Sequence, residues 1–349
     1  MWRLGYLCAG VLFGLSSTIL VDAQSAALKD TQFSGVLRLQ WSDTQGRNSR
    51  DGFETRLARL IAVAPLDART TGRIMVEFAS GTTARSADLL DAFITWRADA
   101  QTTVYAGQMR LPLSYDIRAG IITLDVPERT LMVGAYFAGV RSQGVYAARL
   151  LDRNNTLELG VWNSLTINDP QANVRGGEGA YIGTFSWRYR QGGTQLALGG
   201  AVGRRPGFAT RDSVGNPIVV ADADRRAFYV EFEQRVSSAP LTLRAIYLAG
   251  RDRNPVGGLT APQFTEASDY RDWVAYAIYN LTARHQLALR WEDFDPDTAR
   301  PNDQRQALAI VYHYFPEENI RMSLSYERFL EQGASVDNDR IIAAVQYRF

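Results

Sequence analysis

Residue types that often carry chemistry are scarce in this chain, which has one cysteine (Cys8), one lysine (Lys29) and two histidines. These are too few thiol and imidazole groups for the spaced ligands of a zinc site or for a disulfide framework. The net charge of +1 excludes the bulk positive charge typical of a nucleic-acid-binding protein. We therefore expect no metal, no cofactor and no nucleic-acid partner.

Long apolar runs are scarce as well. The only one, from Leu4 to Val21, is short and interrupted by small residues, so it is more typical of a signal peptide than of a membrane-spanning helix. The residues that follow offer a cleavage site before Gln24. We expect residues 1–23 to be a cleaved signal peptide, which would leave a mature chain without cysteine and send it through the periplasm.

The last eleven residues alternate between apolar and polar side chains and end on an aromatic one, Phe349. Successive side chains of a strand point to opposite faces, so one face is apolar while the other carries Arg340, Gln346 and Arg348. An apolar face suits lipid, and an aromatic end suits the membrane interface. Outer-membrane barrels end in this way, and we expect the barrel-assembly machinery to recognise Phe349.

The same alternation recurs through the rest of the chain in segments of about ten residues, with long and short connections in turn. This pattern predicts an all-β protein: a transmembrane antiparallel β-barrel in the lipid of a Gram-negative outer membrane. Residues 24–349 would form a single barrel domain of sixteen strands, wide enough for an aqueous channel. The expected strands are residues 32–42, 53–64, 71–80, 89–97, 103–110, 138–150, 156–165, 179–190, 195–205, 225–236, 241–252, 271–281, 286–295, 305–315, 320–330 and 339–349.

One connection, residues 111–137, departs from the pattern because it is the longest and the most apolar. An exposed loop should be hydrophilic, so we expect this one to fold into the lumen and constrict it. Charged side chains there would set the ion preference of a pore. Alternatively, its arginines pair with its acidic residues and hold the loop to the wall. The candidate pore-lining residues are Arg38, Arg56, Arg73, Arg110, Arg118, Arg129, Arg141, Asp116, Asp125 and Glu128.

Residues 107–113, Gly-Gln-Met-Arg-Leu-Pro-Leu, and the later Pro-Glu-Arg at 127–129 resemble the constriction loop of the phosphate-selective porin O and P family. Residues 53–60 and 91–93 are similar to its second and fourth strands. The resemblance implies a homotrimer of sixteen-strand barrels that passes small anions, phosphate among them, along a ladder of lumen arginines. The family also has lysines near the pore, and here this chain departs from it, because Lys29 is its only lysine.

The sequence therefore predicts a porin, a passive diffusion channel for small hydrophilic solutes that favours inorganic or organic anions. A general porin without anion preference is the alternative, because acidic residues recur beside the wall arginines. A barrel that acts as a sheath for a partner protein would need an open lumen. An outer-membrane enzyme would need a nucleophile beside a base, and no serine lies near His285 or His313 in sequence. We expect no enzymatic activity.

Overall fold

The computed structural model describes residues 30–46, 51–79, 87–137, 140–163, 181–205, 208–211, 217–220, 222–253, 267–332 and 337–349. The expected signal peptide, residues 1–23, lies outside these residues. Within the described chain, no helix combines the length and the apolar character needed to cross a membrane.

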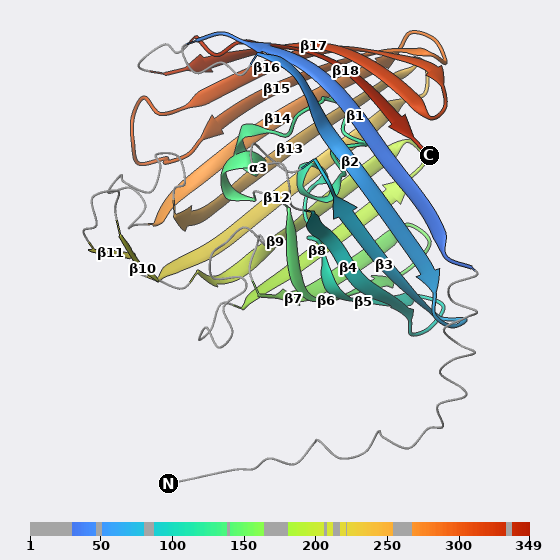
Figure 1. Ribbon diagram of the computed structural model, residues 1–349. Helices are drawn as coiled ribbons and strands as arrows, with labels where there is room; N and C mark the ends of the chain where they lie inside the picture. The colour runs from blue at the N-terminus through green and yellow to red at the C-terminus, as the bar shows by residue number, and fades with distance from the viewer. Residues whose placement is uncertain are drawn as a thin grey trace.

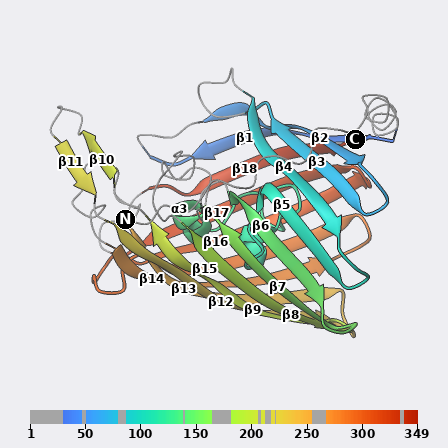
Figure 2. The same ribbon diagram turned by 90° about the horizontal axis from the view of Figure 1, so that it is seen from below.

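Sixteen strands of the described chain form one closed antiparallel barrel (Figures 1 and 2). The expected fold class and strand number are therefore confirmed. The strands are β1 (Gln32–Thr44), β2 (Gly52–Pro65), β3 (Thr70–Glu77), β4 (Asp88–Arg97), β5 (Thr102–Arg110), β6 (Arg141–Leu150), β7 (Asn155–Trp162), β8 (Ile182–Gln191), β9 (Thr194–Arg205), β12 (Ala223–Val236), β13 (Leu241–Arg253), β14 (Ala267–Asn280), β15 (His285–Asp295), β16 (Arg305–Glu317), β17 (Ile320–Glu331) and β18 (Arg340–Arg348).

The barrel is apolar outside and polar inside, the reverse of a soluble protein. In β12 the alternation is regular: Phe228, Val230 and Phe232 are exposed, while Glu231 and Glu233 between them are buried. The exposed face suits hydrocarbon, and the buried face points into the lumen. The period of two in the sequence therefore sorts side chains between lipid and lumen.

The barrel closes because the first strand, β1, pairs with the last strand, β18. Leu37 of β1 lies opposite Tyr347 of β18, and Leu39 lies opposite Val345. At the end of the seam, the Gly35 amide donates to the Phe349 carbonyl at 2.8 Å. The pairing leaves no free strand edge in the sheet, as hydrocarbon requires, because an unpaired backbone group has no water to bond there.

Three details differ from the sequence prediction. The expected loop at 206–224 contains two short strands, β10 (Phe208–Arg211) and β11 (Pro217–Val220), which form a separate sheet beyond the barrel wall (Figures 1 and 2). Residues 111–137 contain two short helices, α2 (Tyr115–Arg118) and α3 (Leu131–Tyr136). All four elements are too short to give a readable period in the sequence. Strand β6 also begins at Arg141, later than expected.

Candidate functional site

The connection between β5 and β6 lies inside the barrel, where α3 is seen within the ring of strands (Figures 1 and 2). Its apolar side chains pack into three clusters with wall residues, and Ile117, Val133 and Phe137 in the largest are fully buried. The Tyr136 ring stacks on the Tyr270 ring of β14, with centroids 4.0 Å apart. Burial of this apolar surface explains why the loop folds inward instead of extending into water.

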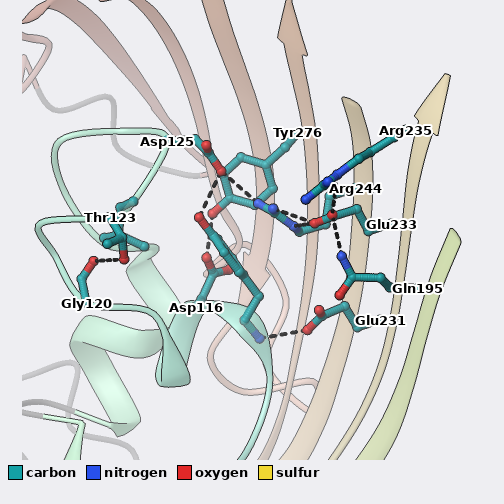
Figure 3. Close-up of polar contacts among 12 residues, drawn as sticks. Asp116, Gly120, Thr123, Asp125, Gln195, Glu231, Glu233, Arg235, Arg244 and Tyr276 are labelled. Atoms are coloured by element: carbon teal, nitrogen blue, oxygen red, sulfur yellow. Dashed lines mark hydrogen bonds and ion pairs between the residues drawn. The ribbon is translucent and has the colours of Figure 1, made fainter. Parts of the chain in front are cut away.

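The middle of the loop is held by the cluster in Figure 3. One carboxylate oxygen of Asp125 accepts hydrogen bonds from Arg244 of β13 and from the Tyr115 hydroxyl, each at 2.8 Å. Arg244 also pairs with Glu233 of β12 at 2.6 Å, and its guanidinium lies 3.5 Å from the centroid of the Tyr115 ring. The Tyr115 amide donates to Glu231 at 2.7 Å. Asp125 is therefore part of the contact between loop and wall.

Asp116 belongs to the same contact. Its side chain is 2% exposed, and it accepts a hydrogen bond of 2.6 Å from the Tyr276 hydroxyl of β14. Burial raises the pKa of the Asp116 carboxyl, because a charge in this enclosed position loses its hydration. The structure thus encloses Asp116 between loop and wall.

A second point of attachment surrounds Glu128. Its two carboxylate oxygens accept from Arg56 of β2 at 3.0 and 2.9 Å, and Arg38 of β1 lies 3.8 Å away. Arg38 also donates to the Pro127 carbonyl at 3.0 Å, and Arg290 of β15 donates to the Glu128 carbonyl at 2.8 Å. Burial alone would raise the pKa of Glu128, but the Arg56 and Arg38 guanidinium groups hold it below its ordinary value.

Wall side chains also hold the loop through its backbone. His313 of β16 donates from Nε2 to the Asp125 carbonyl at 2.9 Å, and Arg321 of β17 donates to the Leu124 carbonyl at 3.0 Å. Gln346 of β18 donates to the Ile122 carbonyl at 3.2 Å. None of these three is among the pore-lining residues expected from the sequence. Alternation along their strands indicates an inward orientation, but only the structure reveals their partners on the loop.

The remaining arginines of the loop are held in different ways. Arg118 makes a two-pronged ion pair with Glu158 of β7. Arg129 donates to the carbonyls of Asp116 and Ala119, so it braces the loop internally. Both arginines are therefore fixed in place, one by the wall and one by the loop itself.

Arg73, Arg110 and Arg141 lie on the wall at β3, β5 and β6. Arg73 and Arg141 share Asp91 of β4, at 3.2 and 2.6 Å. Within the described chain, the only hydrogen bond of the Arg110 side chain runs to the Arg118 carbonyl at 3.4 Å, and no carboxylate pairs with it. Arg110 thus forms no direct ion pair with a carboxylate in the described chain.

Beside Arg110 lies a pocket of about 210 Å³ between the start of the loop and the wall. In the described chain, β3 and β4 make no hydrogen bond with residues 111–137, so the loop is held to other parts of the wall and leaves space here. Three of the predicted arginines, Arg73, Arg110 and Arg118, line this pocket. Arg38 and Arg56 lie elsewhere and contact Glu128. The lining residues of the pocket are Arg73, Asp91, Phe93, Tyr105, Met109, Arg110, Leu111, Pro112, Arg118 and Tyr146.

The fold is similar to those of solved outer-membrane porins and channels. The channel DcaP of Acinetobacter baumannii matches with a TM-score of 0.67 and 16% identity, over 92% of this chain and 97% of that one. An anion-selective porin from Comamonas acidovorans matches with a TM-score of 0.67 and 10% identity, over 92% and 99%. The trimer form of OmpT from Vibrio cholerae matches with a TM-score of 0.62 and 11% identity, over 91% and 99%.

No family model matches the chain, and no curated protein matches its sequence. At these identities the structural likeness establishes the fold. The expected outer-membrane location is confirmed, because this fold and its apolar exterior are those of outer-membrane proteins.

Proposed function

We propose that this chain is a passive porin in which residues 111–137 constrict the lumen and the arginines beside the remaining passage favour anions. One observation carries the proposal: the loop is bonded to β1, β2, β7, β8 and β12–β18, and an arginine-lined pocket is left beside β3–β6. A loop attached in this way would set the size limit for solutes, and the free space beside it would be the route for ions.

The preference for anions follows from the charges around that pocket. Three arginines line it: Arg73 pairs with Asp91, Arg118 pairs with Glu158, and Arg110 forms no ion pair in the described chain. An excess of fixed positive charge in a narrow passage raises the local concentration of anions, and weak, multiple sites let them leave again. The alternative of a general porin requires these charges to be cancelled, and the lack of an ion pair at Arg110 in the described chain argues against that.

Finer features of the proposal come from the resemblance and from the structural neighbours. Phosphate is one permeant that planar guanidinium groups would accept, as the resemblance to the phosphate-selective family implies. A homotrimer is proposed by analogy with the trimer form of OmpT. Cleavage of residues 1–23 and recognition of Phe349 by the assembly machinery belong to the same proposal.

The test is the reversal potential of the purified protein in a planar bilayer under a KCl gradient, compared with that of Arg110→Gln. The proposal predicts a chloride-favouring potential that moves toward zero in the variant. The same substitution at Arg271, an outward-facing residue of β14 that is 48% exposed, should leave the potential unchanged. A potential of zero or one that favours potassium would support the general porin, and absence of current would overturn the open pore.

A further inference from the structure

The pocket beside Arg110 has two unlike walls, one basic and one aromatic. We propose that it binds small aromatic carboxylates, compounds with one ring and one carboxylate such as benzoate, as they pass through the barrel. The inference rests on the proposed porin function and names the class of solute that the pore selects. It differs from phosphate selectivity because it uses the apolar wall as well as the arginines.

The aromatic wall is built from side chains that face the lumen, where other strands carry charged groups. The rings of Tyr105 in β5 and Tyr146 in β6 are stacked, with centroids 4.4 Å apart and an interplanar angle of 5°. Phe93 of β4 lies against Tyr105 at 6.4 Å, and Trp162 of β7 lies against Tyr146 at 5.7 Å. This row of rings offers an apolar wall, and the edges of the stacked pair can pack against a further aromatic ring.

Two of the three arginines in the basic wall are both fixed and accessible. Arg73 and Arg118 are held by Asp91 and Glu158, yet their side chains remain 32% and 33% exposed. Arg110 lacks a carboxylate, and its one hydrogen bond at 3.4 Å is long. A ligand carboxylate would therefore supply the acidic partner that Arg110 lacks, in the two-pronged geometry that guanidinium groups favour.

The pocket is large enough to hold one aromatic ring and one carboxylate. An engineered apolar cavity of roughly 150 Å³ in another protein holds benzene. The pocket here has about 210 Å³, which leaves space for a carboxylate beside the ring. A solute much larger than this would have to displace the loop residues Leu111 and Pro112 that line the opposite side.

The chemistry of the lining favours an aromatic carboxylate over a compact anion. Phosphate is strongly hydrated on all sides, and the wall of Phe93, Tyr105 and Tyr146 cannot replace the water that it would lose there. Acetate would reach Arg110 but would leave the rings without a contact. The carboxylate of a benzoate ion would pair with the arginines, and its ring would pack against the tyrosines. Both walls of the pocket would therefore make favourable contacts with the same solute.

The test measures binding of 4-fluorobenzoate to the purified full-length barrel in detergent by fluorine NMR. Arg110→Gln should weaken binding about tenfold, as loss of one charge-assisted pair implies. Tyr146→Leu should weaken it severalfold while Tyr146→Phe, which keeps the ring, should not. The control Arg271→Gln lies on the outer face and should bind as the parent does. Benzoate should displace the probe at much lower concentration than phosphate or acetate.

Two results would overturn the inference: displacement of the probe by phosphate as readily as by benzoate, or unchanged binding in both Arg110→Gln and Tyr146→Leu. Current measurements on the same preparations separate this from the porin proposal. Anion-favouring current without binding of the probe would sink the aromatic-carboxylate inference alone. Ring-dependent binding by a protein that carries no current would sink the porin proposal and keep the pocket as a ligand site.

Discussion

The arginines of the lumen differ in the groups that each one faces. Arg56 meets the Glu128 carboxylate and Arg129 meets two backbone carbonyls, so both hold the loop in place. Arg110 has no acidic partner in the described chain and lines the pocket. The same residue type therefore stabilises the loop at some positions and creates an excess of positive charge at another.

Replacement of Glu128 by glutamine should loosen the loop, because Arg38 and Arg56 would lose their carboxylate in a largely enclosed position. Removing one partner of a buried ion pair lowers the stability by about 3 kcal/mol. The effect should be smaller here because Arg56 is partly exposed. We expect more frequent closures and higher noise in single-channel recordings of Glu128→Gln. Glu54→Gln is the matched control, since Glu54 is an exposed carboxylate on the same strand as Arg56 and accepts from Gln40 of β1 and not from the loop. Equal noise in both variants would contradict the assigned role.

The lowered pKa of Glu128 gives a pH dependence with a definite sign. An acidic group whose pKa is depressed in the folded protein contributes its full stabilisation above its ordinary pKa of about 4.3. That contribution is lost as the pH falls through the depressed value. The part of the channel noise that depends on Glu128, measured as the difference between the parent and Glu128→Gln, should therefore stay constant between pH 7 and 5 and shrink only below about pH 4. A rise between pH 7 and 5 in the parent protein would show that another group controls the loop.

At the scale of elements, the seam between β1 and β18 is closely packed around Gly35. A methyl group added there would lie 2.3 Å from the Phe349 ring and 2.8 Å from the Arg59 carbonyl. Gly35→Ala should destabilise the closed barrel by about 1–3 kcal/mol through overpacking. We expect a lower unfolding temperature in heat-modifiability gels. Gly183→Ala in β8 is the control, because its nearest contact would be 3.8 Å away. Equal shifts in both variants would contradict the argument.

Most of the strands could be predicted from the sequence because lipid and lumen impose a period of two on every strand. The helices α2 and α3 could not, because a helix of four or six residues has too few turns for a pattern. Contacts made far along the chain fix them instead: Tyr276 bonds to Asp116 in α2, and Glu292 accepts from the Met132 amide in α3. The alternation of side chains along each segment therefore predicts the strands. The two helices depend on contacts between residues that lie far apart in the sequence.

At the scale of the whole molecule, the loop is bonded to strands from both ends of the chain. Ile122 and Gln346, which meet in the lumen, are separated by 224 positions. The sequence could indicate that the loop turns inward, because it is apolar, and that inward-facing arginines surround it. It could not indicate which arginines find a carboxylate, because that depends on the register of strands that close the barrel.

If ions pass the arginine-lined pocket beside the loop, modification of a single cysteine in that pocket should block them. Arg73→Cys would be made in a Cys8→Ser chain, which then has no other cysteine. A sulfonate-bearing thiol reagent should reduce the current through this variant and move its reversal potential toward cations. Arg271→Cys on the outer face should not respond. Unchanged current through a fully modified Arg73→Cys barrel would show that ions take another route and would contradict the account.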